Sequence, residues 1–148
     1  MKNENEDLIE EVDAIKIDEL ALLNDKYLRL AAEYENYRRR TSQTIADSRD
    51  NGIIDMFLKL TTFIENMRAA NENGQYTLLY KSLLKGLNEA GFTPYGEVGD
   101  EFGDEYEAIG TMHTGDVPDG CVNSVYSLGW KYKNGKIVQY CKVMVEKS

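Results

Sequence analysis

The 148-residue sequence predicts an α+β protein with a long N-terminal coiled-coil helix, short helices that form a dimeric four-helix bundle, and a small C-terminal, mostly-β domain. Three observations predict this fold class. Apolar side chains recur about every 3.5 residues in the first part of the chain. A second helical pattern then ends in turn residues, and both prolines and most glycines follow it. We place the domains at residues 1–54, 55–91 and 92–148.

The long helix is predicted by a row of apolar residues that alternate in steps of three and four. This seam consists of Leu20, Leu23, Tyr27, Leu30, Tyr34 and Tyr37. Residues 1–51 contain no proline or glycine, so nothing obliges the helix to end early. The pattern is longer than an ordinary globular helix. We therefore expect the seam to pair with a second copy of the chain; docking on the chain's own domain is the alternative.

The two ends of this helix carry weaker signals. Residues 1–7 are polar and charged and are expected to fray. Residues 8–17 have helical spacing but do not keep one heptad phase with the seam. Beyond Tyr37 the seam positions are polar, at Thr41, Thr44 and Ser48. Gly52 then marks either a turn or a tolerated helical glycine; we favour one continuous helix to about Ile54, with a break as the alternative.

Two further helices are predicted next. Residues 53–68 are apolar at i, i+3, i+4 and i+7, which is typical of a helix with a broad buried face. Residues 71–74 end it, and a shorter helix follows over 76–89. That helix is expected to bury part of a leucine face: Leu78, Leu79, Leu83, Leu84 and Leu87. Two antiparallel helices make half a core, so two copies of the chain would form a four-helix bundle.

The last third reads as short strands and turns. Residues 122–126 are strand-like, and residues 128–132 continue after a kink. Asn134-Gly135 is the strongest hairpin signal, because both residues can take positive φ in a type I′ turn. The returning strand is predicted over residues 137–145, with alternate side chains on one face: Ile137, Gln139, Cys141, Val143 and Val145.

Composition argues against several classes of protein. The net charge of −9 disfavours a general nucleic-acid binder, since phosphate needs a basic surface. No hydrophobic run is long enough to span a membrane, and no signal-peptide pattern occurs at the start, so we expect a cytoplasmic protein. Cys121 and Cys141 lack CxxC spacing and do not cluster with His113, so free thiols are expected, with a disulfide as the alternative.

The sequence contains no motif that predicts an active site. The acidic residues between 100 and 107 lack the EF-hand spacing and have no neighbouring base or nucleophile, so a solvated acidic loop is expected. His113 has no second candidate ligand nearby. Neither a Walker loop nor GxGxxG occurs. We expect no enzymatic activity, no cofactor and no metal.

Three consecutive arginines, Arg38, Arg39 and Arg40, cover most of a helix circumference. They can form a solvated turn that pairs with Glu33, Glu35 and the partner helix. Alternatively, they form a docking patch for an acidic protein surface, because guanidinium groups bind carboxylates in bidentate fashion. A basic-zipper DNA reader is disfavoured by the overall charge.

Several segments resemble the GrpE family, the nucleotide exchange factors of DnaK-type chaperones. Residues 30–41, Leu-Ala-Ala-Glu-Tyr-Glu-Asn-Tyr-Arg-Arg-Arg-Thr, are similar to the helical signature of that family. Further matches follow in the family's order from about residue 8 onward: the bundle-helix motif at 60–67, Gly91-Phe92 at the end of the second bundle helix, the β-domain entry at 101–108, and the segments 118–122 and 129–138.

The sequence departs from the family pattern in three places. The histidine of the His-Glu-Ala motif is missing, which leaves Tyr106 before Glu107-Ala108. The closing Arg-Pro-Ala reads Gln139-Tyr140-Cys141, and the basic position after the Asn-Leu pair of the first bundle helix falls on Ala69, with Arg68 beside it. These changes affect individual contacts and leave the architecture standing.

The resemblance implies a homodimer in which a β-domain engages the nucleotide-binding domain of a DnaK-type chaperone and opens its cleft, so that ADP leaves. It implies chaperone contacts at Arg38, Arg39, Phe102, Tyr126, Lys136 and Val145. A heat-responsive long helix is also implied. The alternative is a dimeric coiled-coil scaffold whose β module binds an unrelated protein.

Overall fold

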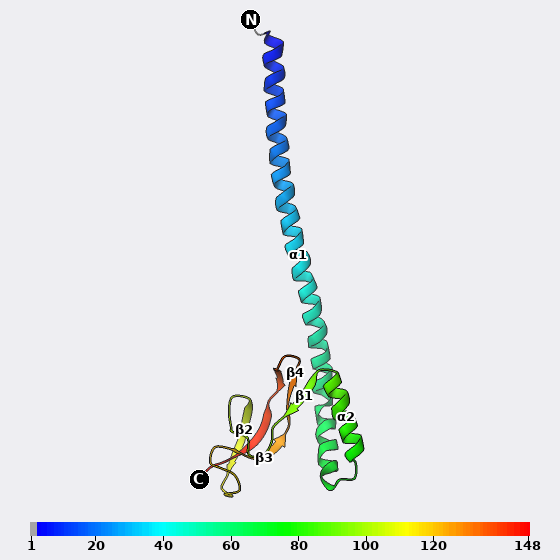
Figure 1. The fold of residues 1–148 in the computed structure, drawn as a ribbon, viewed down its shortest axis with the longest axis vertical. Helices are drawn as coiled ribbons and strands as arrows, with labels where there is room; N and C mark the ends of the chain where they lie inside the picture. The colour runs from blue at the N-terminus through cyan, green and yellow to red at the C-terminus, as the bar shows by residue number, and fades with distance from the viewer. Residues whose placement is uncertain (1–2) are drawn as a thin grey trace. The chain divides into compact units, whose positions relative to one another are not determined.

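The structure is a computed structural model and describes residues 3–148. Its elements confirm the predicted α+β class. They are α1 (Glu4–Ala70), the 3₁₀ turn η1 (Asn71–Asn73), α2 (Thr77–Glu89), β1 (Phe92–Tyr95), β2 (Tyr106–Met112), β3 (Val122–Ser127), β4 (Gly129–Tyr132), β5 (Lys136–Gln139) and β6 (Cys141–Glu146) (Figure 1). The chain divides into two compact units, Met1–Asp50 and Asn51–Ser148, which we call the helical unit and the C-terminal unit.

Helix α1 begins earlier than the polar start of the sequence predicts. Residues 4–7 are already helical, and the carbonyl of Asn3 accepts the backbone N–H groups of Glu6 and Asp7 at 2.8 and 3.3 Å. The first turn holds Glu4, Glu6 and Asp7, whose negative charge favours a helix N-terminus. Residues 4–7 are therefore helical in the structure, their fraying stays a prediction, and Met1 and Lys2 lie outside the described residues.

The same helix continues through Asn51-Gly52 to Ala70 without a break. A Cβ atom at Gly52 would meet nothing within 4 Å, so no close approach requires this glycine. The continuous helix that we favoured is observed, and it extends into the segment predicted as the first bundle helix. Its end matches the predicted stop signal, because Gly74 has φ 72° and its N–H bonds the carbonyl of Asn71.

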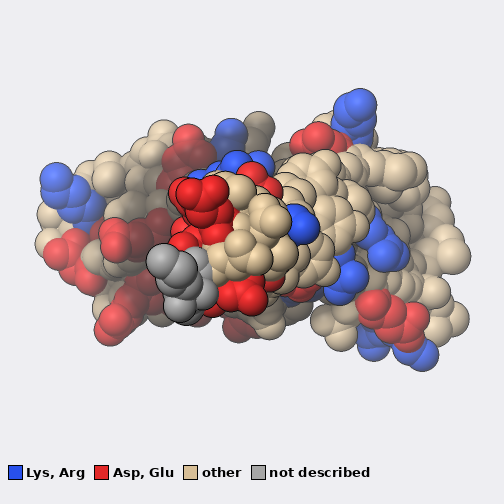
Figure 2. Space-filling view, turned by 90° about the horizontal axis from the view of Figure 1, so that it is seen from above, with Lys and Arg blue, Asp and Glu red and all other residues tan. Residues whose placement is uncertain are grey.

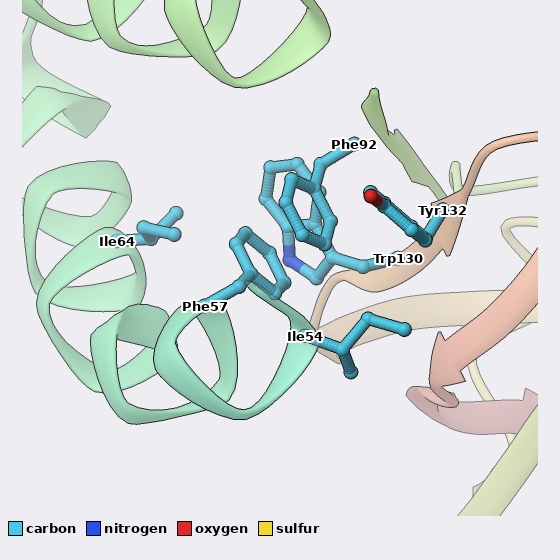
Figure 3. Packing of buried hydrophobic residues seen from close by; sticks show 6 residues of the cluster. All are labelled: Ile54, Phe57, Ile64, Phe92, Trp130 and Tyr132. Atoms are coloured by element: carbon cyan, nitrogen blue, oxygen red, sulfur yellow. The ribbon is translucent and has the colours of Figure 1, made fainter. Parts of the chain in front are cut away.

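An aromatic core holds the C-terminal unit together. Phe57 of α1 stacks on Phe92 of β1 with ring centroids 3.9 Å apart, and its ring meets Trp130 edge-on at 5.1 Å (Figure 3). Tyr132 packs on Phe92 at 4.7 Å, and Ile54 and Ile64 complete the cluster. Burying such side chains is the main favourable term in folding. This core therefore fixes the end of α1 against strands β1 and β4.

Helix α2 runs back alongside the end of α1 and covers the same core (Figure 1). Leu83, Leu84 and Leu87 are partly buried against the aromatic cluster, as predicted. Leu78 and Leu79 are exposed by 85% and 61% in the single chain, so their burial stays a prediction that depends on a second copy. Both lie in the first half of α2, whereas the leucines that pack against the aromatic cluster lie in its second half, which leads into β1.

The strands form two three-stranded sheets, in the orders β1-β4-β5 and β2-β6-β3. Strand β2 is parallel to β6, and every other pairing is antiparallel. The predicted hairpin joins β4 and β5, and the N–H of Lys136 bonds the carbonyl of Lys133 at 3.1 Å. Asn134 and Gly135 have the positive φ values that we predicted, 43° and 80°. The loop is nevertheless one residue longer than a two-residue type I′ hairpin, because Tyr132 pairs with Lys136 and Lys133, at φ 29°, also lies in the loop.

The single returning strand predicted over residues 137–145 is wrong. Strand β5 ends at Gln139 in one sheet, and β6 begins at Cys141 in the other, so only Cys141, Val143 and Val145 share a buried face. The phenol of Tyr95 occupies this break. Its oxygen accepts the N–H of Cys141 at 3.4 Å, and its hydroxyl lies 3.4 Å from the carbonyl of Gln139 and 2.6 Å from that of Glu105.

The ring of Tyr95 fits only because the first residue of β4 is a glycine, Gly129. A Cβ atom at Gly129 would lie 2.2 Å from the ring of Tyr95, so any other residue here would displace the ring. Cys121 and Cys141 are buried free thiols, as predicted. Within residues 3–148, none of the helices is both long and apolar enough to cross a membrane.

Candidate protein-binding surfaces

The seam of α1 is uncovered in the single chain. Its six side chains are exposed by between 58% (Tyr37) and 69% (Leu20), although all are leucine or tyrosine. The seam residues are Leu20, Leu23, Tyr27, Leu30, Tyr34 and Tyr37. A contiguous apolar stripe of this kind on a solvated helix is typical of a surface that another chain covers. The helical unit alone offers no second layer to cover it, because its described residues form one helix.

The arginine triplet lies beside the end of this seam. Arg38 pairs with Glu35 at 3.8 Å, both side chains being largely exposed, whereas Glu33 pairs with Arg29 at the same distance. Exposed pairs of this length contribute little to stability, so these guanidinium groups are available for a stronger partner. Figure 2 shows acidic and basic side chains interspersed over the face that it presents. The triplet therefore fits contact with a carboxylate-bearing protein surface.

Three of the predicted contact residues of the C-terminal unit are exposed. Phe102 lies in the loop before β2, where its N–H bonds the carbonyl of Gly120 at 3.1 Å. Tyr126 lies near the end of β3 and is exposed by 70%. Lys136 is the exposed first residue of β5. Phe102 is tied to Gly120 before β3, Tyr126 lies near the end of β3, and Lys136 belongs to the other sheet, so the three residues come from different elements.

Val145 has a different environment. It lies on β6 with an exposed fraction of 9% and belongs to the core cluster of Val122, Cys141 and Val143. Its side chain lies on the buried face of the sheet β2-β6-β3. Any contribution of Val145 to a binding surface therefore acts through the position of β6.

The acidic segment before β2 is organised by hydrogen bonds within the chain. Asp100 accepts hydrogen bonds from the hydroxyl of Tyr106 at 2.6 Å and from the N–H of Glu97 at 2.8 Å. Both bonds lower the pKa of the Asp100 carboxyl, and the bond from Tyr106 has the larger effect. Glu105 pairs with Lys131 at 2.8 Å. Among residues 3–148, no three His, Cys, Asp or Glu side chains are placed to hold a metal ion. These carboxylates shape a loop.

Three charged residues important to the C-terminal unit were not predicted from the sequence. Glu146 accepts four hydrogen bonds from the loop and strand around it. Arg68 and Glu65 of α1 contact the backbone of Tyr126, near the end of β3, and of Leu128, before β4. The only sequence signal was the i, i+3 spacing of Glu65 and Arg68, which many surface helices share. His113 bonds the carbonyl of Lys147.

A solvated heptad helix that continues into a small two-sheet unit defines an α+β protein that presents surfaces to other proteins. Comparison with known proteins then gives the family. The GrpE family model matches residues 1–147. The chain is 27% identical over 159 residues to Protein GrpE of Chlamydia abortus, covering 99% of this chain and 82% of that protein. It is 32% identical over 144 residues to Protein GrpE of Parabacteroides distasonis, covering 83% and 70%.

The chain therefore belongs to the GrpE family, the co-chaperones of DnaK-type chaperones that act as nucleotide exchange factors in the stress response. Protein GrpE of Brachyspira hyodysenteriae is similar to a comparable extent, at 28% identity over 158 residues. The resemblance seen in the helical signature is thereby confirmed.

Proposed function

We propose that two copies of this chain pair along the seam of α1, and that the homodimer binds the nucleotide-binding domain of a DnaK-type chaperone and speeds the release of ADP. Family membership supports the partner. The observation that carries the dimer is the seam itself, in which leucine or tyrosine recurs in alternating steps of three and four over residues 20–37 and every member remains exposed in one chain.

Burial of the seam gives the pairing its free energy. Covering a leucine side chain fully contributes roughly 1.5–3 kcal/mol, and a two-fold axis covers the same seam residues on both chains. Exposed apolar side chains on both helices of the C-terminal unit support the four-helix bundle. They are Leu60 and Phe63 of α1, and Leu78 and Leu79 of α2.

The proposed contacts divide into two groups. Arg38 and Arg39 dock the helical unit on an acidic area of the chaperone, and Phe102, Tyr126 and Lys136 engage its nucleotide-binding domain directly. Val145 holds β6 in place from the core. These contacts are stronger when the nucleotide cleft is open. By linkage, a partner that prefers the open cleft weakens nucleotide binding by the same factor.

We also propose that α1 responds to heat. The seam is polar at Thr41, Thr44 and Ser48, so pairing buries little apolar surface there, and Gly52 follows with poor helix propensity. The hydroxyl of Thr44 bonds the carbonyl of Arg40 at 2.9 Å, a local bond that competes weakly with the helix ladder.

Stopped-flow release of a fluorescent ADP from a purified DnaK-type chaperone tests the proposal. Increasing concentrations of this chain are expected to raise the release rate to a plateau. Light scattering of the free chain is expected to give the mass of a dimer. A release rate that does not change at any concentration contradicts the exchange function and favours a scaffold that binds an unrelated protein.

A further inference from the structure

Glu65 and Arg68 lie one turn apart on α1 and form hydrogen bonds with the backbone at the junction of β3 and β4. Arg68 Nε donates to Glu65 Oε2 at 2.8 Å, and Arg68 Nη2 donates to the carbonyl of Tyr126 at 3.0 Å. The N–H of Leu128 donates to the other carboxylate oxygen, Glu65 Oε1, at 2.8 Å. The pair, which we call the clasp, therefore holds the carbonyl before Ser127 and the amide after it.

The clasp contacts the chain at a point where the pairing of β3 with β6 is irregular. The pairing of β3 with β6 shifts register between Val125 and Ser127, so the ladder is irregular at Tyr126. Strand β4 belongs to the other sheet. The backbone at 126–128 thus takes part of its position from α1, through two side chains.

The environment makes these bonds stronger than the other ion pairs of α1. The side chains of Arg68 and Glu65 are exposed by only 27% and 21%, and their closest atoms lie 2.8 Å apart. The pairs Arg29–Glu33 and Arg38–Glu35 are 3.8 Å long and largely exposed. Short, charge-assisted bonds in a partly dehydrated place are screened less by water and salt.

We propose that the clasp is a positioning device for Tyr126, whose carbonyl it holds inward while the phenol is left exposed for a partner. Tyr126 serves as a contact only under the proposed function, so this inference rests on it. Arg68 and Glu65 act through the backbone of Tyr126. Arginine suits the task because its planar fork bonds Glu65 and the carbonyl at once, which the point charge of lysine does not reproduce.

The test uses the full chain with two measurements. Hydrogen exchange at the amide of Leu128 reports the clasp itself, and the plateau rate of fluorescent-ADP release from a DnaK-type chaperone reports its consequence. The variants are Arg68→Ala, Arg68→Lys, Tyr126→Ala, and Arg68→Ala combined with Tyr126→Ala. Lys59→Ala, which removes another cation from the same stretch of α1, is the matched control.

Arg68→Ala is expected to speed exchange at Leu128 by about tenfold, because the carboxylate that holds this amide loses its charged partner. It is expected to lower the plateau release rate to that of Tyr126→Ala. The double variant is expected to fall no further, because the effects of two substitutions that act through the same contact are not additive. Arg68→Lys is expected to restore part of both measurements, and Lys59→Ala to match the wild type.

Two results overturn the inference: Leu128 exchange that is unchanged in Arg68→Ala, or a double variant whose loss is the product of the two single losses. Should Arg68→Ala fail to fold, Glu65→Gln takes its place, since it keeps the volume but leaves one oxygen for two donors. A wild-type chain that does not speed release refutes the proposed function, and Leu128 exchange still decides the clasp.

Discussion

The carboxylate of Glu146 shows how a single residue holds a loop of the C-terminal unit. Its side chain accepts the N–H groups of Thr114 and Gly115 at 2.7 and 2.9 Å, the hydroxyl of Thr114 at 2.9 Å and the amide of Asn123 at 2.6 Å. The Gly115 N–H is the main cause that lowers the pKa of Glu146, and the Thr114 hydroxyl and Asn123 amide add to it. One ionised group therefore joins β6, β3 and the loop between β2 and β3.

Acid is expected to destabilise the C-terminal unit through Glu146 and Asp100. Both carboxyls have a lower pKa in the folded state than in the unfolded state. Their contribution to the free energy of unfolding is therefore complete above the ordinary pKa, 4.5 for the glutamate, and is lost as the pH falls through the lowered pKa of the folded state. Glu146→Gln is expected to be less stable than wild type at pH 7, and the difference is expected to shrink toward pH 3.

Urea unfolding at several pH values, followed by the fluorescence of Trp130, measures this difference. Trp130 is the single tryptophan of the chain and lies in the aromatic core. Glu89→Gln, an exposed carboxylate at the end of α2, is the control. If wild type and Glu146→Gln lose stability in parallel between pH 7 and pH 3, the ionised carboxylate does not hold the loop.

Among the elements, α1 carries two stretches of different character. Over residues 20–37 its seam is apolar, and over residues 41–52 the seam is polar and ends near a glycine. Both stretches are helical in the single chain. A solvated helix of this length owes most of its stability to tertiary or quaternary packing, so the two stretches should respond differently to dilution and to heat.

Leu30→Asp is expected to dissociate the proposed dimer, because two carboxylates would face each other across the two-fold axis in a dehydrated seam. An unpaired buried charge costs several kcal/mol, which exceeds what one seam position contributes. Ala32→Asp adds the same charge to the same turn but off the seam and should leave the dimer intact. Light scattering of both variants at equal concentration measures the outcome; an undiminished Leu30→Asp dimer contradicts the seam assignment.

Gly52→Ala is expected to raise the temperature at which α1 loses helicity. An added methyl at this position meets no atom within 4 Å, and alanine favours a helix over glycine by about 1 kcal/mol. Gly86→Ala in α2, which also has open space around it, should leave the α1 transition unmoved. Circular dichroism on heating distinguishes them. A single transition that coincides with the loss of Trp130 burial would count against a separately melting segment.

At the scale of the whole molecule, the proposed contacts lie on both units. Arg38 and Arg39 belong to the helical unit, whereas Phe102, Tyr126 and Lys136 belong to the C-terminal unit. If the first group docks the chaperone and the second opens its cleft, their losses should differ in kinetic form. A docking loss is recovered by raising concentration, and a loss of preference for the open state is not.

Lys136→Glu is expected to lower the plateau rate of ADP release, and Arg39→Glu to raise the concentration needed to reach an unchanged plateau. Lys136 follows the hairpin loop and is exposed, so the charge reversal should leave the fold within about 0.5 kcal/mol of wild type. Stopped-flow release run to saturation with each variant measures both quantities. A Lys136→Glu variant that reaches the wild-type plateau would mean that the hairpin docks without opening the cleft.

The sequence by itself determined what depends on neighbouring residues. The heptad spacing, the absence of proline and glycine before residue 52 and the stop at Asn71–Asn73 and Gly74 predicted the helices, and Asn134-Gly135 predicted the hairpin and its positive φ values. Each of these rests on local backbone preference or on the period of side chains around one helix. The family signature of residues 30–41 also lies within one helix, which is why it was readable before any fold.

Only the tertiary structure decided how the strands are shared between sheets. Alternation ran unbroken from Ile137 to Val145 in the sequence, but the phenol of Tyr95, 46 positions before Cys141, separates two strands there. The clasp of Glu65 and Arg68 on the backbone at 126–128 likewise joins residues about 60 positions apart. Burial of Val145 and exposure of Tyr126 follow from that arrangement, because a strand's inward face depends on which strands lie beside it.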